Sequence, residues 1–535
     1  MKQISKMAVL LLLFILSFTQ CKKQLDLMPL GQLTEQTFYQ TEKDFDAASL
    51  SAYNPLLNYY FPQDGFAWYR PILFPDDDVT VRSGNPDDIE DFNWLPGNGD
   101  FNYVYQNSYK GVQRANVVIE QLPKATKFAD PSKKARYEAE AKYMRAYYNF
   151  ILAINWGTPP LALQTMKSLE ETRLPNSKPG EIWDAVVSDL TFAKQNLPPT
   201  WDAANLGRAT SGAASGLLGR VLLYRAQWEN KPALYTAADA EFTSIISSGR
   251  YSLMPSFADV FALAKENNAE SLFEVQFAYG RNNNWYENDA NDNTGGGSGT
   301  GRYIMWRVAG EAGNNAPGAN ADGYGLVHIV KPLQDAFEPG DPRRVETIFR
   351  EGDPTPWKYP NTTVNATYRA AWSITGSTPA KYILNDKSGA EVTGWQPNMG
   401  TNNERVLRYA DILLMSAECK ILGPTTNLAA AATLINRVRR RADPSGTILA
   451  DRPAGVSKDQ MFKFLMQERR VELALESHRY NDLVRWHRAN LINIKTDINF
   501  GRTAANTNWS AKNLLKPIPQ RELDLNGKLT QNTGY

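Results

Sequence analysis

The sequence predicts a mostly α-helical protein of tetratricopeptide-like helical hairpins, with a long loop-rich face and few short strands. The first observation is helical periodicity, because apolar side chains recur at three- and four-residue steps in residues 137–154, 213–224, 407–421 and 430–441. The second is that helices rich in Ala and Leu are followed by a short turn and another helix, as in helical repeats whose consensus has decayed. The third is a pair of long Gly-, Asn- and aromatic-containing segments that cannot hold regular structure.

In the first half, residues 137–154 form the first strongly periodic helix, which Gly157 and the Thr-Pro-Pro that follows it terminate. A second helix over residues 213–224 begins behind a capping Thr210. Its small residues Ala213 and Ala214 allow a neighbouring helix to approach closely. Both helices therefore have one buried face.

In the second half, residues 407–421 form an amphipathic helix that ends at Gly423-Pro424. Residues 430–441 form the helix that returns beside it. Residues 461–486 are predicted to form a long, charged helix. The second half thus repeats the helical pairing of the first.

The composition excludes several classes of protein. The 535 residues contain 58 Lys+Arg and 57 Asp+Glu, so there is no basic excess to neutralise nucleic-acid phosphates. A mean hydropathy of -0.45 with 42% hydrophobic residues excludes both a polytopic membrane protein and a disordered chain. The two cysteines, Cys21 and Cys419, and the three histidines have no zinc or iron–sulfur spacing, so neither a metal nor a cofactor is expected.

The N-terminus has the pattern of a lipoprotein signal. Lys2 and Lys6 precede an apolar run over residues 7–18, which is shorter than the ~20 residues that span a bilayer. Cys21 stands where a bacterial lipoprotein signal places the acylated cysteine. Residues 1–20 are therefore predicted to be a signal peptide and Cys21 a lipid anchor. The alternative is an ordinary secreted protein in which Cys21 is incidental.

Two irregular regions are candidates for binding loops. Residues 280–332 and 66–102 are long loops, and loops of this length are usually functional or disordered. Both contain several Trp and Tyr residues, in which disordered segments are usually poor. Each aromatic residue in them either contacts a ligand or anchors its loop against the helical body.

The carboxylates Glu468, Glu472 and Glu476 recur at four-residue steps, near the separation that glycosidases use. Nearby arginines, Arg469, Arg479 and Arg485, lower carboxylate pKa values and leave no protonated acid. An ionic lattice that ties helices together is therefore the favoured interpretation. The sequence also has no nucleophile elbow, and nothing in it requires an enzyme.

A series of motifs follows Cys21 in a fixed order, among them Arg145-Ala146-Tyr147, Trp156-Gly157-Thr158-Pro159-Pro160, Gly207-Arg208-Ala209-Thr210-Ser211, Arg408-Tyr409-Ala410-Asp411, Glu468-Arg469-Arg470-Val471-Glu472 and the terminal Gln531-Asn532-Thr533-Gly534-Tyr535. Read together, Cys21 and these motifs resemble the SusD/RagB family of Bacteroidota outer-membrane lipoproteins. The resemblance covers essentially the whole chain after the signal.

The resemblance implies four tetratricopeptide-like hairpins, a loop-rich face that binds glycan or peptide nutrients, and docking as a lid on a SusC-like TonB-dependent barrel transporter. Residues 21–230 would form the SusD-like N-terminal region and residues 265–535 the RagB/SusD C-terminal region of one compact body. Location at the outer membrane, with exposure at the cell surface, follows from the same resemblance.

For the ligand-binding residues we expect aromatic platforms, because sugar rings stack their C–H faces on indole and phenol, together with fixed polar partners for the hydroxyls. The candidates are Trp68, Asp77, Arg82, Asn93, Trp94, Trp285, Trp306 and Tyr324. Two other functions stay open at this point. One is a helical-repeat adaptor that binds only protein, and the other is a glycoside hydrolase whose acids lie in residues 66–102.

Overall fold

The computed structural model describes residues 38–60, 69–81, 87–277, 325–354, 367–382 and 402–535. Within these ranges the protein is mostly helical with a few short strands, which confirms the predicted fold class. Here no helix is both long enough and apolar enough to cross a membrane.

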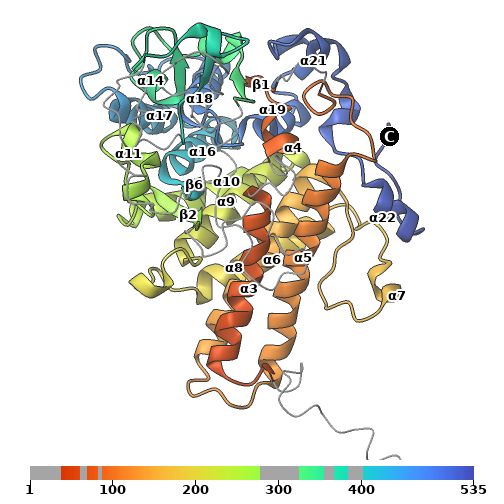
Figure 1. The fold of residues 1–535 in the computed structure, drawn as a ribbon. Helices are drawn as coiled ribbons and strands as arrows, with labels where there is room; N and C mark the ends of the chain where they lie inside the picture. Colours follow the sequence, from red (N-terminus) through yellow and green to blue (C-terminus); the bar gives the residue numbers. More distant parts are fainter. Residues whose placement is uncertain (1–37, 61–68, 82–86, 278–324, 355–366, 383–401) are drawn as a thin grey trace, which may run out of the picture.

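The first half is a series of helices in which each packs against the next (Figure 1). The series consists of α3 (Glu42–Tyr60), α5 (Gly99–Gln121), α6 (Lys133–Trp156), α8 (Glu181–Asn196), α9 (Ser211–Trp228) and α10 (Ala233–Ser247). Close approach is built into α9, because a Cβ atom on Gly219 would lie 2.5 Å from the ring of Phe242 on α10.

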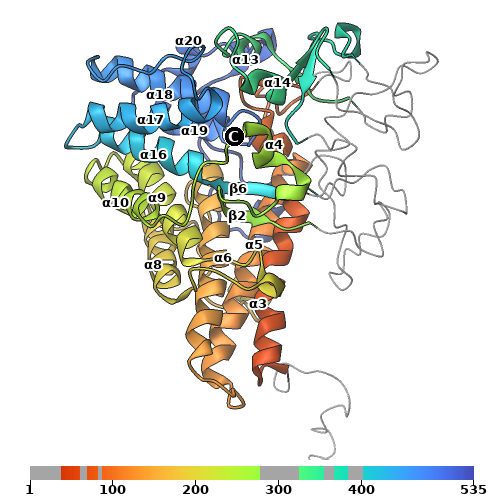
Figure 2. The same ribbon diagram turned by 90° about the vertical axis from the view of Figure 1, so that its left-hand side faces the viewer.

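The second half continues the same stack. α10 packs against α16 although residues 248–408 separate them in sequence, and α16 then packs against the next two helices. The continuing helices are α16 (Tyr409–Leu422), α17 (Leu428–Ala442), α18 (Lys458–Glu472) and α19 (Arg479–Arg488). Figure 2 shows α8, α9, α10, α16, α17 and α18 as one ladder along the side of the molecule.

Among the described residues, the strands form three antiparallel pairs. They are β1 (Val79–Thr80) with β3 (His328–Ile329), β2 (Ser271–Val275) with β6 (Glu404–Arg408), and β4 (Ile348–Arg350) with β5 (Ser377–Pro379). β6 runs directly into α16, so the β2–β6 pair holds together the two ends of the segment that leaves the stack. Short helices complete the fold: α4 (Tyr69–Leu73), α7 (Leu169–Thr172), α11 (Phe257–Phe261), α13 (Lys331–Gln334), α14 (Arg343–Thr347), α20 (Ile494–Asp497), α21 (Thr503–Asn508) and α22 (Gln520–Leu525).

Four predicted helices are confirmed. α6 ends at Gly157, whose φ of 76° lies in the left-handed region that favours glycine. α9 begins at the predicted cap, where the Thr210 hydroxyl accepts a 3.1 Å hydrogen bond from the amide of Ala213. α16 and α17 occupy the third and fourth predicted segments, although Leu407 belongs to β6.

The long helix predicted over residues 461–486 is wrong, because the structure has two helices there. α18 ends at Glu472 and α19 begins at Arg479; between them Leu475 and Ser477 have positive φ values of 66° and 63°. The buried Lys381 supplies hydrogen bonds at the point where the helix breaks. Its ammonium donates to the carbonyls of Glu472 (3.2 Å) and Ala474 (2.8 Å). Carbonyls that would accept within a helix are satisfied from outside it.

The predicted ionic lattice around Glu468, Glu472 and Glu476 is present, with all three side chains buried. The partners differ from the predicted arginines. They are Arg343, Arg408, Arg439 and Arg441 together with Lys381. The predicted Arg469 and Arg485 pair instead with other buried carboxylates, and Arg479 pairs with Asp77.

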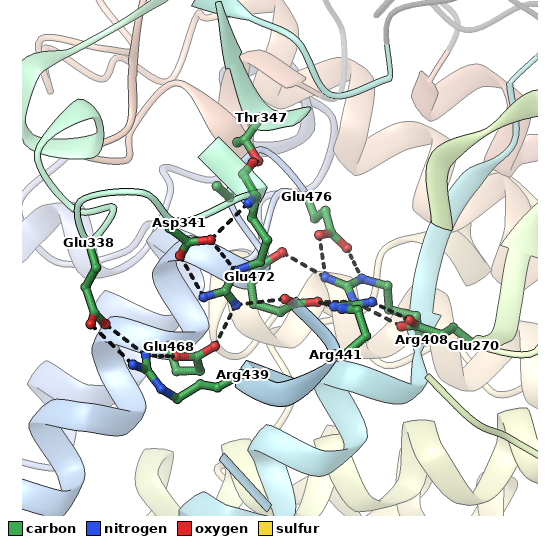
Figure 3. A network of polar contacts seen from close by, with 12 residues as sticks. Glu270, Glu338, Asp341, Thr347, Arg408, Arg439, Arg441, Glu468, Glu472 and Glu476 are labelled. Atoms are coloured by element: carbon green, nitrogen blue, oxygen red, sulfur yellow. Dashed lines mark hydrogen bonds and ion pairs between the residues drawn. The ribbon is translucent and has the colours of Figure 1, made fainter. Parts of the chain in front are cut away.

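Glu472 lies near the centre of this network, between Arg408 and Arg441 on one side and the Glu468 region on the other (Figure 3). Its Oε1 accepts from Arg408 at 2.8 Å and from Arg441, and its Oε2 accepts from Arg343 at 3.0 Å. Burial raises the pKa of Glu472, but Arg441, Arg408 and Arg343 together hold it well below the usual range of a glutamate. The carboxylate is therefore ionised and structural.

We predict that Glu472→Gln lowers the free energy of unfolding by about 3 kcal/mol or more, because it leaves buried guanidinium groups without a counter-charge. Denaturant unfolding at neutral pH measures this. The control is Asp335→Asn, which breaks the solvent-exposed 2.6 Å pair with Lys331 and should change stability little. Equal stability of the parent and Glu472→Gln would contradict the assigned role.

Candidate ligand-binding face

The described members of the predicted site are Asp77, which lies just before β1, and Asn93 and Trp94, which lie in the loop over residues 87–98. β1 pairs with β3 through Val79–Ile329 and Thr80–His328. The carboxylate of Glu90 accepts from the amide of Val81 at 2.6 Å and from the Thr80 hydroxyl at 3.1 Å. This loop is therefore held by specific polar contacts on the strand that precedes it.

Asp77 is buried and forms ion pairs with Arg470 of α18 and Arg479 of α19. Arg479 donates to both of its carboxylate oxygens, at 2.7 and 3.0 Å, and Arg470 lies 3.0 Å from Oδ2. Burial raises the pKa of Asp77, but Arg470 and Arg479 outweigh that effect and bring it to about 2. Asp77 thus holds the segment in place, and in this structure its oxygens are occupied by protein.

The pKa values of Asp76 and Asp78 shift upward, in the opposite direction to that of Asp77. Burial raises the pKa of Asp78. Burial also raises the pKa of Asp76, and the nearby charges of Asp78 and Asp77 raise it further, to well above the usual range.

Arg502 is a third arginine that holds this region. It donates to the carbonyl of Val79 and, at 3.1 Å, to the carbonyl of Glu90. Three arginines distant in sequence, Arg470, Arg479 and Arg502, therefore hold residues 77–79 and Glu90.

Trp94 is a core residue in the structure, with 1% of its surface exposed. Its indole N–H donates to the carbonyl of Ile89 at 2.9 Å, and its ring packs edge-on against Phe101 and Tyr480. Since no ring face is open to a ligand, Trp94 fits the second of the two expectations, an aromatic side chain that anchors its loop. The ligand-platform role expected for it is not supported by this position.

Asn93, next to Trp94, is exposed. Its Oδ1 accepts a 3.3 Å hydrogen bond from the side-chain amide Nδ2 of Asn508 on α21. The anchored Trp94 thus presents Asn93 to solvent at a fixed place. The remaining candidates, Trp68, Arg82, Trp285, Trp306 and Tyr324, and the predicted anchor Cys21, lie outside the described residues.

The residues that sequence reasoning missed are the ones that hold the loop. They are Arg470, Arg479 and Arg502, which lie about 400 positions from the segment that they fix. No local pattern connects such partners. In the described parts of the chain no group of three His, Cys, Asp or Glu side chains is arranged to hold a metal ion.

Comparison with known proteins identifies the family. The sequence profile of the SusD family matches residues 262–535, and a second profile, described as "Starch-binding associating with outer membrane", matches residues 78–223. The first match alone covers half of the chain. The chain therefore belongs to the SusD family, and the resemblance that its motifs indicated is confirmed.

Relatives match over nearly their full length. A SusD-like protein of Formosa agariphila is 26% identical across 97% of this chain and 98% of its own, and one of Bacteroides ovatus is 25% identical across 88% and 81%. The fold is also that of solved structures. A SusD homolog from Bacteroides thetaiotaomicron superposes with a TM-score of 0.76 at 21% identity, covering 94% of this chain and 98% of the homolog.

Two further similar structures carry ligand information in their own descriptions. A laminarin-binding SusD-like protein has a TM-score of 0.70 at 24% identity and covers 93% of this chain and 100% of its own. Surface glycan-binding protein A from Bacteroides thetaiotaomicron, solved with laminarihexaose, has a TM-score of 0.71 at 23% identity and covers 92% and 100%. At these identities the likeness establishes the fold.

We predict that the ion pairs of Asp77 make the protein sensitive to acid. A carboxyl whose folded-state pKa of about 2 lies below its unfolded value of roughly 3.9 contributes stability above about pH 5, and that contribution is lost as the pH falls toward 2. Asp77→Asn should therefore be less stable than the parent by roughly 2–3 kcal/mol at pH 7. The difference should shrink between pH 5 and pH 3 in denaturant unfolding. A difference that stays constant with pH would contradict this role.

We predict that Trp94→Ala lowers the free energy of unfolding by about 3 kcal/mol or more, because it empties a buried volume. The matched control is Asn93→Ala, which truncates the exposed neighbour and should leave the melting temperature nearly unchanged. Thermal unfolding of both variants tests this. A Trp94→Ala variant as stable as the parent would show that the indole is not an anchor.

Proposed function

We propose that the protein is a cell-surface lipoprotein that binds glycan oligosaccharides and delivers them to a SusC-like TonB-dependent outer-membrane transporter, acting as its lid. The observation that carries the proposal is membership of the SusD family, with relatives and folds matched over nearly the whole chain. The laminarin-binding and laminarihexaose-bound structures of the same fold support a glycan as ligand. The sequence profile that matches residues 78–223, whose description names association with the outer membrane, supports that location.

The arrangement of residues 76–81 and 87–98 suits a glycan-binding role. Asp77 is assigned to tying its own segment to α18 and α19, and Trp94 to anchoring the loop over residues 87–98. The proposed ligand contacts are therefore Asn93 and the candidates of the two irregular regions, Trp68, Arg82, Trp285, Trp306 and Tyr324. Fixing a binding loop in advance reduces the entropy that is lost when a ligand binds. A rigid support beneath an exposed Asn93 is consistent with binding of this kind.

The test of the proposed function is titration calorimetry with a panel of defined oligosaccharides, with laminarihexaose as the first member. Binding of at least one oligosaccharide, which is recovered intact after long incubation, is the expected result. Saturable binding followed by shortened products would instead favour the glycoside hydrolase. Absence of binding across the panel would favour the protein-only adaptor.

We predict that Trp285→Ala and Trp306→Ala each weaken glycan binding by at least about 2 kcal/mol, roughly thirtyfold, as loss of an aromatic anchor does. Calorimetry with the oligosaccharide that the parent binds measures the effect. Because a surface contact carries little folding stability, the melting temperature should change little. If both variants bind like the parent, the ligand site lies elsewhere.

We predict that Cys21 is acylated and that Cys21→Ser moves the protein from the membrane fraction to the soluble fraction. Several acyl chains make release from a membrane slow, whereas the chain without them has no comparable anchor. Fractionation of cells that express each form tests this. The control is Cys419→Ser, which changes the buried cysteine of α16 and should leave the distribution unchanged. Membrane retention of Cys21→Ser would remove the lipid anchor from the proposal.

A further inference from the structure

A cavity of about 610 Å³ lies between α5, the loop that carries α7 and the C-terminal segment that carries α22. Figure 1 shows these three elements together on one side of the molecule. The lining is mostly apolar or aromatic and includes Tyr105, Tyr109, Met166, Leu169, Leu525 and Leu529. None of the described candidates for ligand binding, Asp77, Asn93 and Trp94, lines it.

The walls of this cavity are fixed by hydrogen bonds between segments far apart in sequence. The side-chain amide of Asn526 donates to the carbonyl of Leu174 at 2.7 Å, and the amide of Thr530 donates to Asn176 Oδ1 at 2.8 Å. The ammonium of Lys528 lies 3.2 Å from the carboxylate of Glu170. The C-terminal segment therefore holds the α7 loop, and the cavity exists before anything binds.

Two leucines at the cavity are left in solvent. Leu169 is 64% exposed and Leu525 is 50% exposed, and both line the cavity. Large apolar side chains gathered at a concave site favour association with another apolar group. This pair comes from α7 and α22, which no sequence pattern places together.

The chemistry of the cavity differs from that expected of a glycan site. Sugar rings stack on open aromatic faces, but Tyr105 is only 3% exposed, and its ring packs against Tyr109 and Trp156 at centroid distances of 4.9 and 5.1 Å. The most exposed apolar side chains of the lining are the aliphatic Leu169 and Leu525, whereas Tyr109 is partly buried and its hydroxyl donates to the carbonyl of Pro160 at 2.6 Å. An apolar side chain fits this lining better than a sugar does.

The charges at the cavity define the chemistry of the occupant further. Three basic residues, Lys110, Arg114 and Arg173, line it together with one acidic residue, Glu522. Glu522 accepts a hydrogen bond from the Gln106 side chain at 3.2 Å. Lys110 is exposed and has no hydrogen-bond or ion-pair partner in the part of the chain that the structure describes. Because Arg173 already pairs with Glu170 at 3.3 Å, it is the Lys110 ammonium that favours an occupant with a carboxylate beside its apolar group.

We propose that this cavity is the docking point for a loop of the partner transporter. The loop inserts one large apolar side chain between Leu169 and Leu525 and places a carboxylate beside Lys110. Anchors of this kind in preformed pockets carry much of the binding energy of protein interfaces. The inference rests on the proposed function, which names the transporter, and adds the surface and the chemistry of the contact.

The experiment purifies the tagged full-length protein from its own outer membrane in mild detergent and measures the barrel recovered for each mole of bait. Leu169→Asp and Leu525→Asp should each reduce recovery at least about tenfold, because they place a carboxylate where an apolar group must enter. The control is Leu206→Asp, a leucine that is 55% exposed and does not line the cavity, which should recover as much barrel as the parent.

A second arm tests the charge. Lys110→Glu should reduce recovery severalfold at low salt and less at high salt, because salt screens the new repulsion. The matched control is Lys463→Glu, an exposed lysine of α18 outside the cavity. Glycan binding and melting temperature should be unchanged in all of these variants. The double variant Leu169→Ala with Leu525→Ala repeats the test without adding charge.

The outcomes separate this inference from the proposed function. If the parent recovers the barrel and the cavity variants recover as much as Leu206→Asp, the docking point is wrong while the transporter partnership stands. If the parent recovers no barrel, both are overturned. If the variants keep the barrel but lose a bound lipid in native mass spectrometry, the cavity holds an acyl chain and the inference is overturned.

Discussion

The structure depends on the return of the chain to its helical stack at Arg408. This residue ends β6, precedes α16, and forms ion pairs with Glu270, Glu472 and Glu476 at 3.2, 2.8 and 2.7 Å. It thereby connects the entry of the inserted segment, its exit and the end of α18. A buried guanidinium is stable only with its counter-charges in place, so the junction strongly favours one arrangement.

Three consecutive residues of α18 form ion pairs with three different parts of the described structure. Glu468 contacts Arg343 and Arg439, Arg469 contacts Asp411 and Asp482, and Arg470 contacts the Asp77–Asp78 segment. Successive side chains of an α-helix point about 100° apart, so one turn reaches three neighbours. The helical stack, its closing junction and the proposed binding face are therefore positioned by the same helix. A displacement of α18 would therefore disturb ion pairs in the stack, at the junction and at the proposed binding face.

The sequence predicted those parts of the structure in which the signal is local. The periodicity of residues 137–154 and the Thr210 cap specify helices through neighbours a few residues away, and both are confirmed. The break after Glu472 was missed because its cause is Lys381, which lies 91 positions earlier in the chain. The arginine partners predicted for Glu468 and Glu472 were wrong because the observed partners, such as Arg343 and Arg408, also lie far away in the sequence. For Trp94, composition alone left two roles open, and only packing against Tyr480 decides between them.

The contact of α10 with α16 has a consequence for how the protein diversifies. The stack closes across residues 248–408 where β2 pairs with β6 and where Arg343, Lys381 and Arg408 reach the buried carboxylates of residues 468–476. The entropic cost of closing a flexible loop grows only logarithmically, by about 0.6 kcal/mol for each doubling of its length. Changes of length between these fixed points are therefore inexpensive for the scaffold, whereas a change at one of them leaves a buried charge unpaired. The proposed ligand-binding surface can therefore change in length between these points while the supporting body stays the same.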